Sequence, residues 1–352
     1  MNFLSALHRP GVLAALTAAL LFGCSTPLAK WLLATLDPWL LAGLLYLGSG
    51  LGLTLYRSII GAPAVRLPRN EWGWLIGAIL VGGIAGPVLL MMGLREIPAS
   101  QASLLLNAEG VFTVLLAWLV FGEHFDRRIA LGVAAIVAGA LVLSWPTDLH
   151  LGALWATAAV LGACLCWAID NNLTRKVSLT DATWIAATKG LVAGTVNLAL
   201  AISHAAHWPN PLSIAAALGI GWAAYGVSLS LFVVGLRHLG SARTGAYFSI
   251  APFFGAALAV LAFNEALTAN LAVAGALMGL GVWLHLTEKH SHPHTHSPLE
   301  HEHEHVHDEH HQHVHDEPVP PHARHSHRHW HEPLTHTHAH FPDSHHQHGH
   351  GG

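Results

Sequence analysis

The chain has 352 residues, of which 53% are hydrophobic and only 10% charged, and its formal net charge is −4. This composition is typical of a chain whose apolar surface faces lipid, and the charge balance argues against a nucleic-acid partner. The three cysteines all lie within apolar runs, so they offer no disulfide framework.

The first apolar run begins after Arg9 and superficially resembles a secretory signal that ends near Cys24. Phe22 is too bulky for a cleavage site, and apolar character resumes through Trp31 to Leu33. We therefore expect a membrane-spanning helix here, followed by nine more apolar runs of about 20 residues, the length that crosses a bilayer. The ten predicted spans are residues 11–33, 39–57, 72–94, 99–121, 128–145, 152–173, 183–203, 212–236, 243–263 and 269–287.

Cations in the connecting loops predict the orientation of these spans. Arg95 and Lys30 lie on one side, and the other loop cations lie opposite. The positive-inside rule makes the cation-rich side cytoplasmic, with both termini there. We expect a multi-pass plasma-membrane protein, in a bacterium the inner membrane. The cytoplasmic cations are Arg9, Arg57, Arg66, Arg69, Arg127, Arg128, Arg175, Lys176, Arg237, Arg243 and Lys289.

One stretch, from Gly93 to Glu123, recurs from Gly235 to Glu265 with nine of 31 ungapped positions identical. Each copy has a short Arg-bearing loop, about 20 apolar residues and an acidic loop. The repeated unit contains five helices, an odd number, so the second copy must enter the membrane upside down. The earlier parts match more weakly, with Phe22-Gly23 resembling Trp167-Ala168 and Asp37 resembling Asp181.

The predicted architecture is all-α and integral to the membrane, with ten transmembrane helices as two inverted five-helix repeats and a disordered C-terminal tail. The repeats cover residues 1–146 and 147–289, and the tail covers 290–352. Ten helices in two halves, the Gly-Leu-Arg motif, and the segments Leu106–Phe112 and Phe121–Glu123 resemble the EamA-type drug/metabolite transporter superfamily. That resemblance spans residues 11–287 and implies a transporter fold, but family members move unlike solutes.

One feature departs from that family, which typically has Glu-Pro in the fourth helix. This chain has Glu109-Gly110 there, and the proline occurs only in the second copy, as Pro252. If a proline kink opens the fourth helix in the family, the flexibility of Gly110 is the alternative here.

Glu109 is the clearest polar candidate, because it lies about ten residues into a predicted span, too deep to reach the surface. An ionisable group costs about 2.5–3.5 kcal/mol at the centre of a spanning helix, so it usually faces a cavity. It is either a substrate or proton site or a neutral carboxyl bonded between helices. Asn107 points about 200° away on an ideal helix, so the two share a face only if the helix is broken.

Asp170, Asn171 and Asn172 close the sixth span, and Lys189 lies one to two turns into the seventh. A short loop between antiparallel helices could bring Asp170 and Lys189 together as a pair. The alternative is that Asp170 and the asparagines lie at the interface. Other candidate pore-lining residues, for which simple packing is an equal alternative, are Gln101, Ser103, Ser228, Ser230, Tyr247 and Ser249.

Composition changes abruptly at His290, because 24 of the last 63 residues are histidine, separated by Asp, Glu and Pro. No periodic apolar face is present, so we expect disorder. Neutral imidazole binds zinc, nickel, cobalt and copper, so the tail is a candidate metal-binding segment with no cofactor required elsewhere. A solvated tail with incidental affinity is the alternative. The candidate ligands are His301, His303, His305, His307, His325, His327, His329, His336, His338 and His340.

These observations favour a secondary transporter that moves a small solute or metabolite by alternating access, with proton coupling as one option, rather than an enzyme. The sequence has no Gly-x-x-x-x-Gly-Lys-Ser/Thr motif for ATP binding. One alternative is a divalent-metal exporter for Ni²⁺, Co²⁺ or Zn²⁺, and another is a membrane-anchored metal buffer or sensor. Expected partners are membrane lipid and a small-molecule or metal-ion substrate, and a homodimer is one oligomeric option.

Overall fold

The computed structural model describes residues 10–121, 127–145, 151–177, 180–204, 209–239 and 241–286, together with four short stretches of the tail, 291–295, 299–305, 325–331 and 335–339. The chain divides into two compact units, Met1–Glu288 and Lys289–Gly352. The described residues of the first unit form helices joined by loops, and those of the second form short strands.

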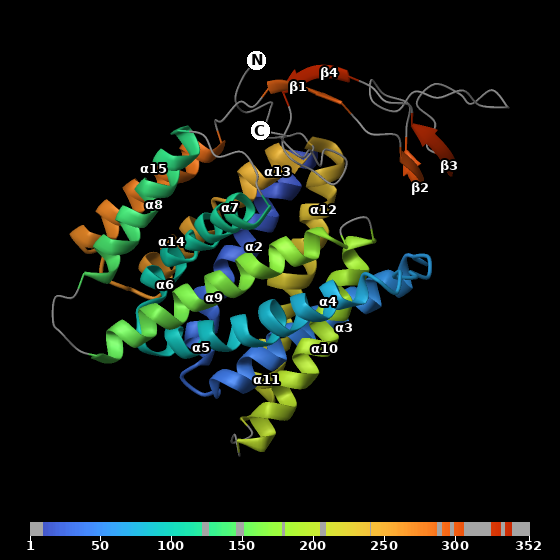
Figure 1. Cartoon of the computed structure of the whole chain (residues 1–352). Helices are drawn as coiled ribbons and strands as arrows, with labels where there is room; N and C mark the ends of the chain where they lie inside the picture. The colour runs from blue at the N-terminus through green and yellow to red at the C-terminus, as the bar shows by residue number, and fades with distance from the viewer. Residues whose placement is uncertain are drawn as a thin grey trace. The chain divides into compact units, whose positions relative to one another are not determined.

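The helices of the first half follow the apolar runs (Figure 1). Asp37 caps α3 by accepting hydrogen bonds from the backbone of Trp39 and Leu40, and Pro38 fits the first turn. The elements of this half are α2 (Pro10–Leu32), α3 (Pro38–Ile59), α4 (Trp72–Ala78), the π-helix η1 (Ile79–Ala85), α5 (Gly86–Glu96), α6 (Ala99–Leu105), α7 (Ala108–Phe121) and α8 (Arg127–Ser144).

The second half starts its helices in the same way, with Asp181 capping α10 and Asn210 capping α11 ahead of Pro211. Its elements are α9 (Leu151–Arg175), α10 (Ala182–Ser203), α11 (Pro211–Gly221), the π-helix η2 (Trp222–Val227), α12 (Ser228–Leu239), α13 (Ser241–Phe248), α14 (Ala251–Ala262) and α15 (Ala269–Leu286).

Among the described residues, eight helical runs are long and apolar enough to cross a membrane, and two further apolar helices, Ala251–Ala262 and Ala269–Leu284, are shorter. The predicted ninth span, 243–263, is interrupted between α13 and α14, which explains why its apolar helix is short. The structure therefore supports many crossings, and the count of ten stays a prediction.

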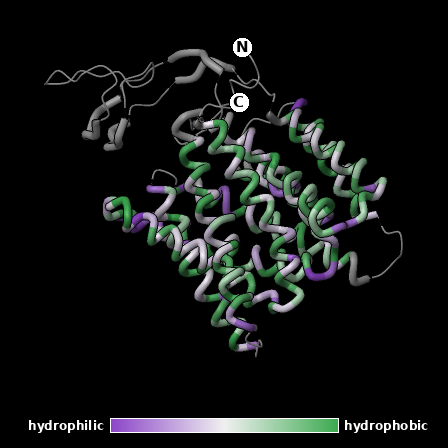
Figure 2. Tube along the Cα trace, turned by 180° about the vertical axis from the view of Figure 1, so that it is seen from behind, coloured by the Kyte–Doolittle hydropathy of each residue, from purple (hydrophilic) through white to green (hydrophobic). Residues whose placement is uncertain are grey.

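The outside of the helical unit is apolar. Large side chains such as Leu131, Leu141, Leu119 and Leu261 are 61–80% exposed. Figure 2 shows hydrophobic residues along most of the length of the helices. A water-soluble protein rarely exposes so much continuous apolar surface, so this surface is suited to lipid.

Helix interruptions recur at equivalent places in the two halves. Gly235 follows Gly93 by 142 residues. Adding 142 to the bounds of η1 (Ile79–Ala85) gives the bounds of η2 (Trp222–Val227) to within one residue. The break between α6 and α7 and the break between α13 and α14 have the same separation, again within one residue. Both halves therefore contain a π-helical segment and a broken helix.

Helix neighbours also correspond when the halves are exchanged. Helix α2 contacts α12 and α14, and its counterpart α9 contacts α5 and α7. Helix α3 contacts α10, and α8 contacts α15. Figure 1 shows α8 and α15 side by side at one edge of the helical unit. These contacts therefore either have a partner contact in the other half or join two equivalent helices.

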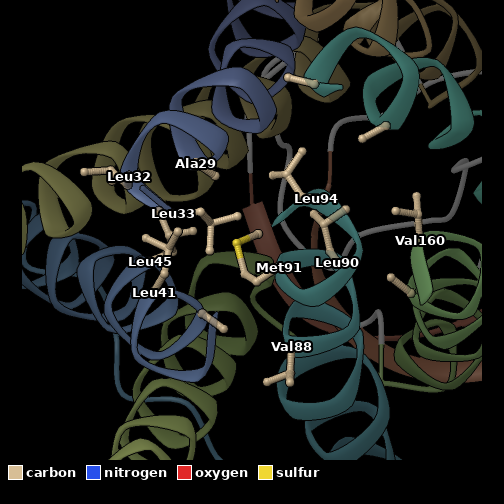
Figure 3. Close-up of a cluster of buried hydrophobic side chains, with 14 of the residues drawn as sticks. Ala29, Leu32, Leu33, Leu41, Leu45, Val88, Leu90, Met91, Leu94 and Val160 are labelled. Atoms are coloured by element: carbon tan, nitrogen blue, oxygen red, sulfur yellow. The ribbon is translucent and has the colours of Figure 1, made fainter. Parts of the chain in front are cut away.

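The largest buried cluster joins both halves around α5 (Figure 3). Met91 of α5 lies toward the leucines of α2 and α3, and Val160 of α9 lies on the opposite side of α5. Met91 and Val160 are at most 1% exposed. Burial of such side chains contributes about 1.5–3 kcal/mol each in water, and between helices in lipid it fixes their packing.

The tail contains two antiparallel strand pairs, β1 (Ser291–Thr295) with β4 (Thr335–Ala339), and β2 (Leu299–His305) with β3 (His325–His331). The disorder predicted for residues 290–352 stays a prediction.

Candidate functional site

Helix α9 carries the polar residues Asp170 and Asn171 next to each other, and they reach different partners. The Lys189 ammonium of α10 lies 2.5 Å and 2.6 Å from the two carboxylate oxygens of Asp170. Thr174 donates to the same carboxylate at 2.8 Å. The predicted pair therefore forms, and the Asp170 and Lys189 side chains are only 9% and 16% exposed.

Asn171 instead contacts the first half of the chain. Its amide nitrogen Nδ2 donates to Glu109 Oε1 at 2.8 Å and lies 3.5 Å from Thr113 Oγ1. Glu109 is half-buried and Asn171 is exposed, so this contact lies nearer the surface of the protein than the buried ion pair beside it. Glu109 and Asn171 therefore form a polar contact between α7 and α9 that joins the two halves.

Backbone carbonyls of η1 complete the surroundings of the ion pair. The Tyr46 hydroxyl and Trp167 Nε1 both donate to the Gly82 carbonyl, at 3.0 Å and 2.9 Å. Asn197 Nδ2 donates to the Gly83 carbonyl at 3.2 Å. A π-helix shifts the hydrogen-bond ladder, and side chains can then bond carbonyls along it.

Gly82 also brings η1 and the ion pair together. A Cβ atom at Gly82 would collide with Oδ2, Cβ and Cγ of Asp170, so the helix can approach this closely only because residue 82 is glycine. Gly82 thus accepts hydrogen bonds from Tyr46 and Trp167 and also lies against Asp170, the partner of Lys189.

An aromatic series leads away from Tyr46 through the bundle. The rings of Tyr46 and Tyr225 lie 5.8 Å apart, and those of Tyr225 and Phe22 lie 5.5 Å apart in an edge-to-face arrangement. Phe22 continues to Phe248 at 5.3 Å, and Phe248 to Phe232 at 5.0 Å. Such ring pairs stabilise helix packing, and their faces also attract cations.

Four other predicted site residues lie elsewhere. Asn107 is buried in the break before α7, where its Nδ2 donates to the Leu104 carbonyl at 2.8 Å. Gln101 donates to the Leu143 carbonyl at 3.1 Å, and Asn172 donates to the Ala168 carbonyl within α9. Tyr247 is half-buried in α13. The helix does break next to Asn107, but the Asn107 side chain donates to a carbonyl of α6 and not to Glu109.

Sequence reasoning missed Tyr46, Gly82, Thr113, Trp167 and Thr174. Gly82-Gly83 was noticeable as a glycine pair, but packing was a sufficient explanation for it. An aromatic residue with a polar tip in the middle of a span, such as Tyr46 or Trp167, was a usable signal, because that tip needs a partner.

Polar contacts also close the ends of the helices. Glu265 accepts from the backbone nitrogens of Ala99 and Ser100, at 2.7 Å and 2.8 Å, and so caps α6 from the other half. Lys30 donates to the carbonyls of Leu94 and Arg95 at the end of α5, where carbonyls lack helical partners.

Arg57 joins α3 to the start of α10. Its Nη1 lies 2.6 Å from Asp181 Oδ2, and it also donates to Thr183 Oγ1 at 2.7 Å. Partial burial raises the pKa of Asp181, but hydrogen bonds from Thr183 and Arg57 outweigh this effect, so its pKa lies below the usual value.

The predicted metal ligands lie in the tail strands where they are described. His301, His303 and His305 are in β2, His325, His327 and His329 in β3, and His336 and His338 in β4. His307 and His340 lie outside the described residues. Among the residues that the structure describes, no group of three or more His, Cys, Asp or Glu side chains could hold a metal ion.

Several proteins named as transporters or exporters are similar to this chain in sequence. An uncharacterized transporter of Methanothermobacter thermautotrophicus is 28% identical over 292 residues, which cover 78% of this chain and 85% of that protein. A probable amino-acid metabolite efflux pump of Escherichia coli is 28% identical over 48% of this chain and 54% of its own length. The pseudopaline exporter CntI of Pseudomonas aeruginosa is 27% identical over 45% and 54%.

A crystal structure with 19% identity superposes with a TM-score of 0.60 over 77% of this chain and 95% of the other, which supports the same fold. The model of the EamA-like transporter family matches twice, over residues 9–145 and 152–287. The two matches cover both halves of the helical unit. This chain is therefore a multi-pass membrane protein that belongs to the EamA-like transporter family.

Proposed function

We propose that this protein is a secondary transporter that moves a small solute bearing an amine by alternating access, through a site between its two halves. The observation that carries this proposal is the Glu109–Asn171 contact, in which a carboxylate from one family match meets an amide from the other. A site shared by two halves changes its accessibility when the halves rock against each other.

The recurring π-helices, the recurring helix breaks and the corresponding contacts support two inverted repeats. In this proposal α13 and α14 together form one interrupted crossing, because residues 241–262 have the length that a bilayer requires. Ten crossings then follow, and the loop cations place both termini in the cytoplasm. Interrupted helices near the centre of a transporter are tolerated where they line a cavity.

The chemistry of the site favours a cationic or zwitterionic solute. Glu109 offers a carboxylate, and Asn171 can accept or donate a hydrogen bond. The faces of Tyr46 and Tyr225 attract ammonium groups. The name of the Escherichia coli relative, an amino-acid metabolite efflux pump, fits a solute of this kind.

Glu109 also suggests how transport is coupled. A carboxylate in this position can hold a proton or the ammonium group of a solute, but not both at once. This competition would link solute movement to proton movement in the opposite direction. The neighbouring Asp170 is already neutralised by Lys189 at 2.5 Å, which leaves Glu109 as the carboxylate for exchange.

A comparison of excreted and retained metabolites tests the proposal. Cells that express wild type, Glu109→Gln, Glu96→Gln or no protein would be compared by mass spectrometry of medium and cytoplasm, with membrane abundance measured in parallel. Glu96 is an exposed residue at the end of α5, so Glu96→Gln is the matched isosteric control. We expect one class of amine to change in wild-type and Glu96→Gln cells, and at least a tenfold smaller change in Glu109→Gln cells.

Two outcomes would contradict the proposal. If Glu109→Gln transports at the wild-type rate, Glu109 is not part of the site. If no organic solute differs but cell-associated nickel, cobalt or zinc falls in wild-type cells, the protein is a metal exporter.

A further inference from the structure

One glutamate joins the two halves at the end of the helical unit that holds Arg95. The Glu265 carboxylate of the second half accepts hydrogen bonds from the backbone nitrogens of Ala99 and Ser100 in the first half, at 2.7 Å and 2.8 Å, and from the Ser100 hydroxyl at 2.5 Å. Asn264 has a φ of 54°, in the left-handed region, so the chain turns sharply between the end of α14 and Glu265. Glu265 is only half-buried, so water can replace its hydrogen bonds.

Lys30 holds together the helix ends that lie on the first-half side of this contact. Its ammonium group donates to the carbonyls of Leu94 and Arg95, at 2.7 Å and 2.8 Å, and thereby ties the end of α2 to the end of α5. A short loop then leads from α5 into α6. Lys30 therefore joins two helices of the same half, whereas Glu265 joins one half to the other.

Helices α2, α6 and α14 pack against one another through glycines next to the Glu265 contact. A Cβ atom at Gly23 would collide with the carbonyl oxygen of Ala251. A Cβ atom at Gly255 would lie 2.6 Å from the Gly23 carbonyl oxygen and 2.7 Å from Ser103 Oγ. We call the contact formed by Gly23, Ser103, Ala251 and Gly255 the seam. Because α6 leads from the Arg95 end to the break before α7, the seam lies between Glu109 and that end of the protein.

The Ser103 hydroxyl sets the seam apart from ordinary helix packing. Ser103 is 0% exposed, and among the described residues its Oγ has no hydrogen-bond partner. Ser228 is equally buried, but its hydroxyl donates to the Ala18 carbonyl at 2.9 Å. A buried hydroxyl without a partner raises the free energy of the state that buries it. The closed seam is thus disfavoured at Ser103 and held by Glu265, as expected for a contact that opens and closes.

We propose that the seam is the gate of the transporter at the Arg95 end, and that Glu265 is the latch that keeps this gate closed. When Glu265 releases α6, α14 separates from α2 and α6, and water reaches the Ser103 hydroxyl. A solute can then pass between Glu109 and the Arg95 end. A helix cap is much weaker than a buried ion pair, so it can break in every transport cycle. This inference rests on the proposed alternating access, and the loop cations predict that the gate faces outward.

The test measures the opening of the seam without any solute. Purified full-length protein in detergent, with its three cysteines replaced by alanine, carries Ser103→Cys as a reporter and reacts with a water-soluble maleimide. Glu265→Ala should increase the labelling rate about tenfold, because the seam is then open for a larger share of the time. Glu96→Ala removes an exposed carboxylate at the same end of the unit and should leave the rate unchanged.

A second reporter distinguishes gate opening from general loosening of the helices. Val160 is also 0% exposed, but it lies on α9 against Gly93 of α5 and not in the seam. Labelling of Val160→Cys should not change in Glu265→Ala. Equal acceleration at both reporters, or no acceleration at Ser103→Cys, would overturn the gate. Neither result bears on Glu109, whose role is decided by the comparison of metabolites.

Thermal unfolding tests the cost of closing the seam. Ser103→Ala removes a hydroxyl that lacks a partner, so the melting temperature should stay the same or rise. Ser228→Ala removes a hydroxyl that donates a hydrogen bond, so the melting temperature should fall. A larger fall for Ser103→Ala than for Ser228→Ala would show that the Ser103 hydroxyl stabilises the closed seam, and it would contradict the proposal.

Discussion

In the first half of the helical unit residue 109 is a glutamate, whereas the corresponding residue of the second half is Ala251. The weaker match of α2 with α9 pairs Phe22 with Trp167, and it therefore pairs Ser25 with Asp170 and Thr26 with Asn171. Asp170 and Asn171 bind Lys189 and Glu109. In the other half, the Ser25 hydroxyl donates to the Phe22 carbonyl of its own helix.

The same contrast holds at the π-helices. Trp167 of α9 donates a hydrogen bond to Gly82 of η1, and its counterpart Phe22 of α2 packs its ring on Tyr225 of η2. Both contacts join a helix of one half to the π-helix of the other. One contact is polar and the other aromatic. The halves thus share a backbone design but carry their charged groups at positions that do not correspond, Glu109 in the first half and Asp170 with Lys189 in the second.

The largest expected effect comes from removing one member of the ion pair. Asp170→Asn or Lys189→Met leaves a buried charge without its partner, so each should lower the free energy of unfolding by about 3–5 kcal/mol. The double variant removes both charges and should recover most of that loss. Thermal unfolding of the purified protein in detergent measures all three. Equal destabilisation by single and double variants would show that the pair is not a unit.

A methyl group at Gly82 should have the next largest effect. Gly82→Ala places a Cβ on Asp170, which Lys189 holds in place, and overpacking of this kind costs about 1–3 kcal/mol. The other half already has Ala224 at the corresponding position of η2. Gly219→Ala in α11 is the control, because a Cβ there meets no atom within 4 Å. Equal melting temperatures for both variants would contradict the close approach of η1 and α9.

Removal of the cap that Glu265 provides should cost about 1 kcal/mol. Glu265→Ala leaves the backbone nitrogens of Ala99 and Ser100 without their carboxylate, at the positive end of α6. Glu71→Ala is the control, since Glu71 precedes α4 without a capping hydrogen bond from its side chain. Because this cap joins the two halves, a reporter cysteine in α6 should also become more reactive toward a water-soluble maleimide in Glu265→Ala alone.

The ion pair between Arg57 and Asp181 should contribute about 0.5 kcal/mol, because it is partly exposed and screened by salt. Asp181→Asn keeps the helix cap but loses the charge, and Asp37→Asn is the equivalent change in the first half. The pKa of Asp181 is lowered in the folded protein, so its contribution is present above the unfolded value of about 3.8 and disappears as the pH falls through the folded value.

Melting temperatures should therefore differ between wild type and Asp181→Asn at pH 7 and converge below pH 4. Asp37→Asn should stay closer to wild type at pH 7. A difference for Asp181→Asn that persisted unchanged in acid would assign the effect to packing and not to the ion pair.

The sequence predicted the extents of the helices well, because bilayer thickness fixes their length. The predicted span 152–173 falls within α9, Leu151–Arg175, and the predicted span 128–145 is displaced by one residue from α8, Arg127–Ser144. The Asp170–Lys189 pair was predictable for a similar reason, since a short loop joins the two helices. The interruptions at η1 and η2 were not predictable, because mean hydropathy contains no information about the hydrogen-bond ladder.

Contacts between distant segments were also beyond the sequence. Nothing in the spacing of residues 109 and 171 indicates that Glu109 meets Asn171, because that contact depends on how α7 packs on α9. Lys30 shows the same limit, since its hydrogen bonds to the Leu94 and Arg95 carbonyls depend on how α5 packs on α2. Gln101 and Asn172 looked like site residues but satisfy backbone carbonyls instead.

The smallest effect is expected at Gly110, the position where this chain departs from the Glu-Pro of related transporters. Gly110→Pro makes the first half resemble the second, in which Pro252 lies in the first turn of α14. Gly110 is the third residue of α7, where a proline is accepted, and a Cβ there meets no atom within 4 Å. Because the helix already breaks at Asn107, the proline adds no new kink.

Transport of the solute identified for wild type should stay within about twofold, as should transport by Gly110→Ala. A large loss of transport in Gly110→Pro alone would mean that the break before α7 must bend during transport. The backbone would then need to be flexible at Gly110 in the first half but not at Pro252 in the second.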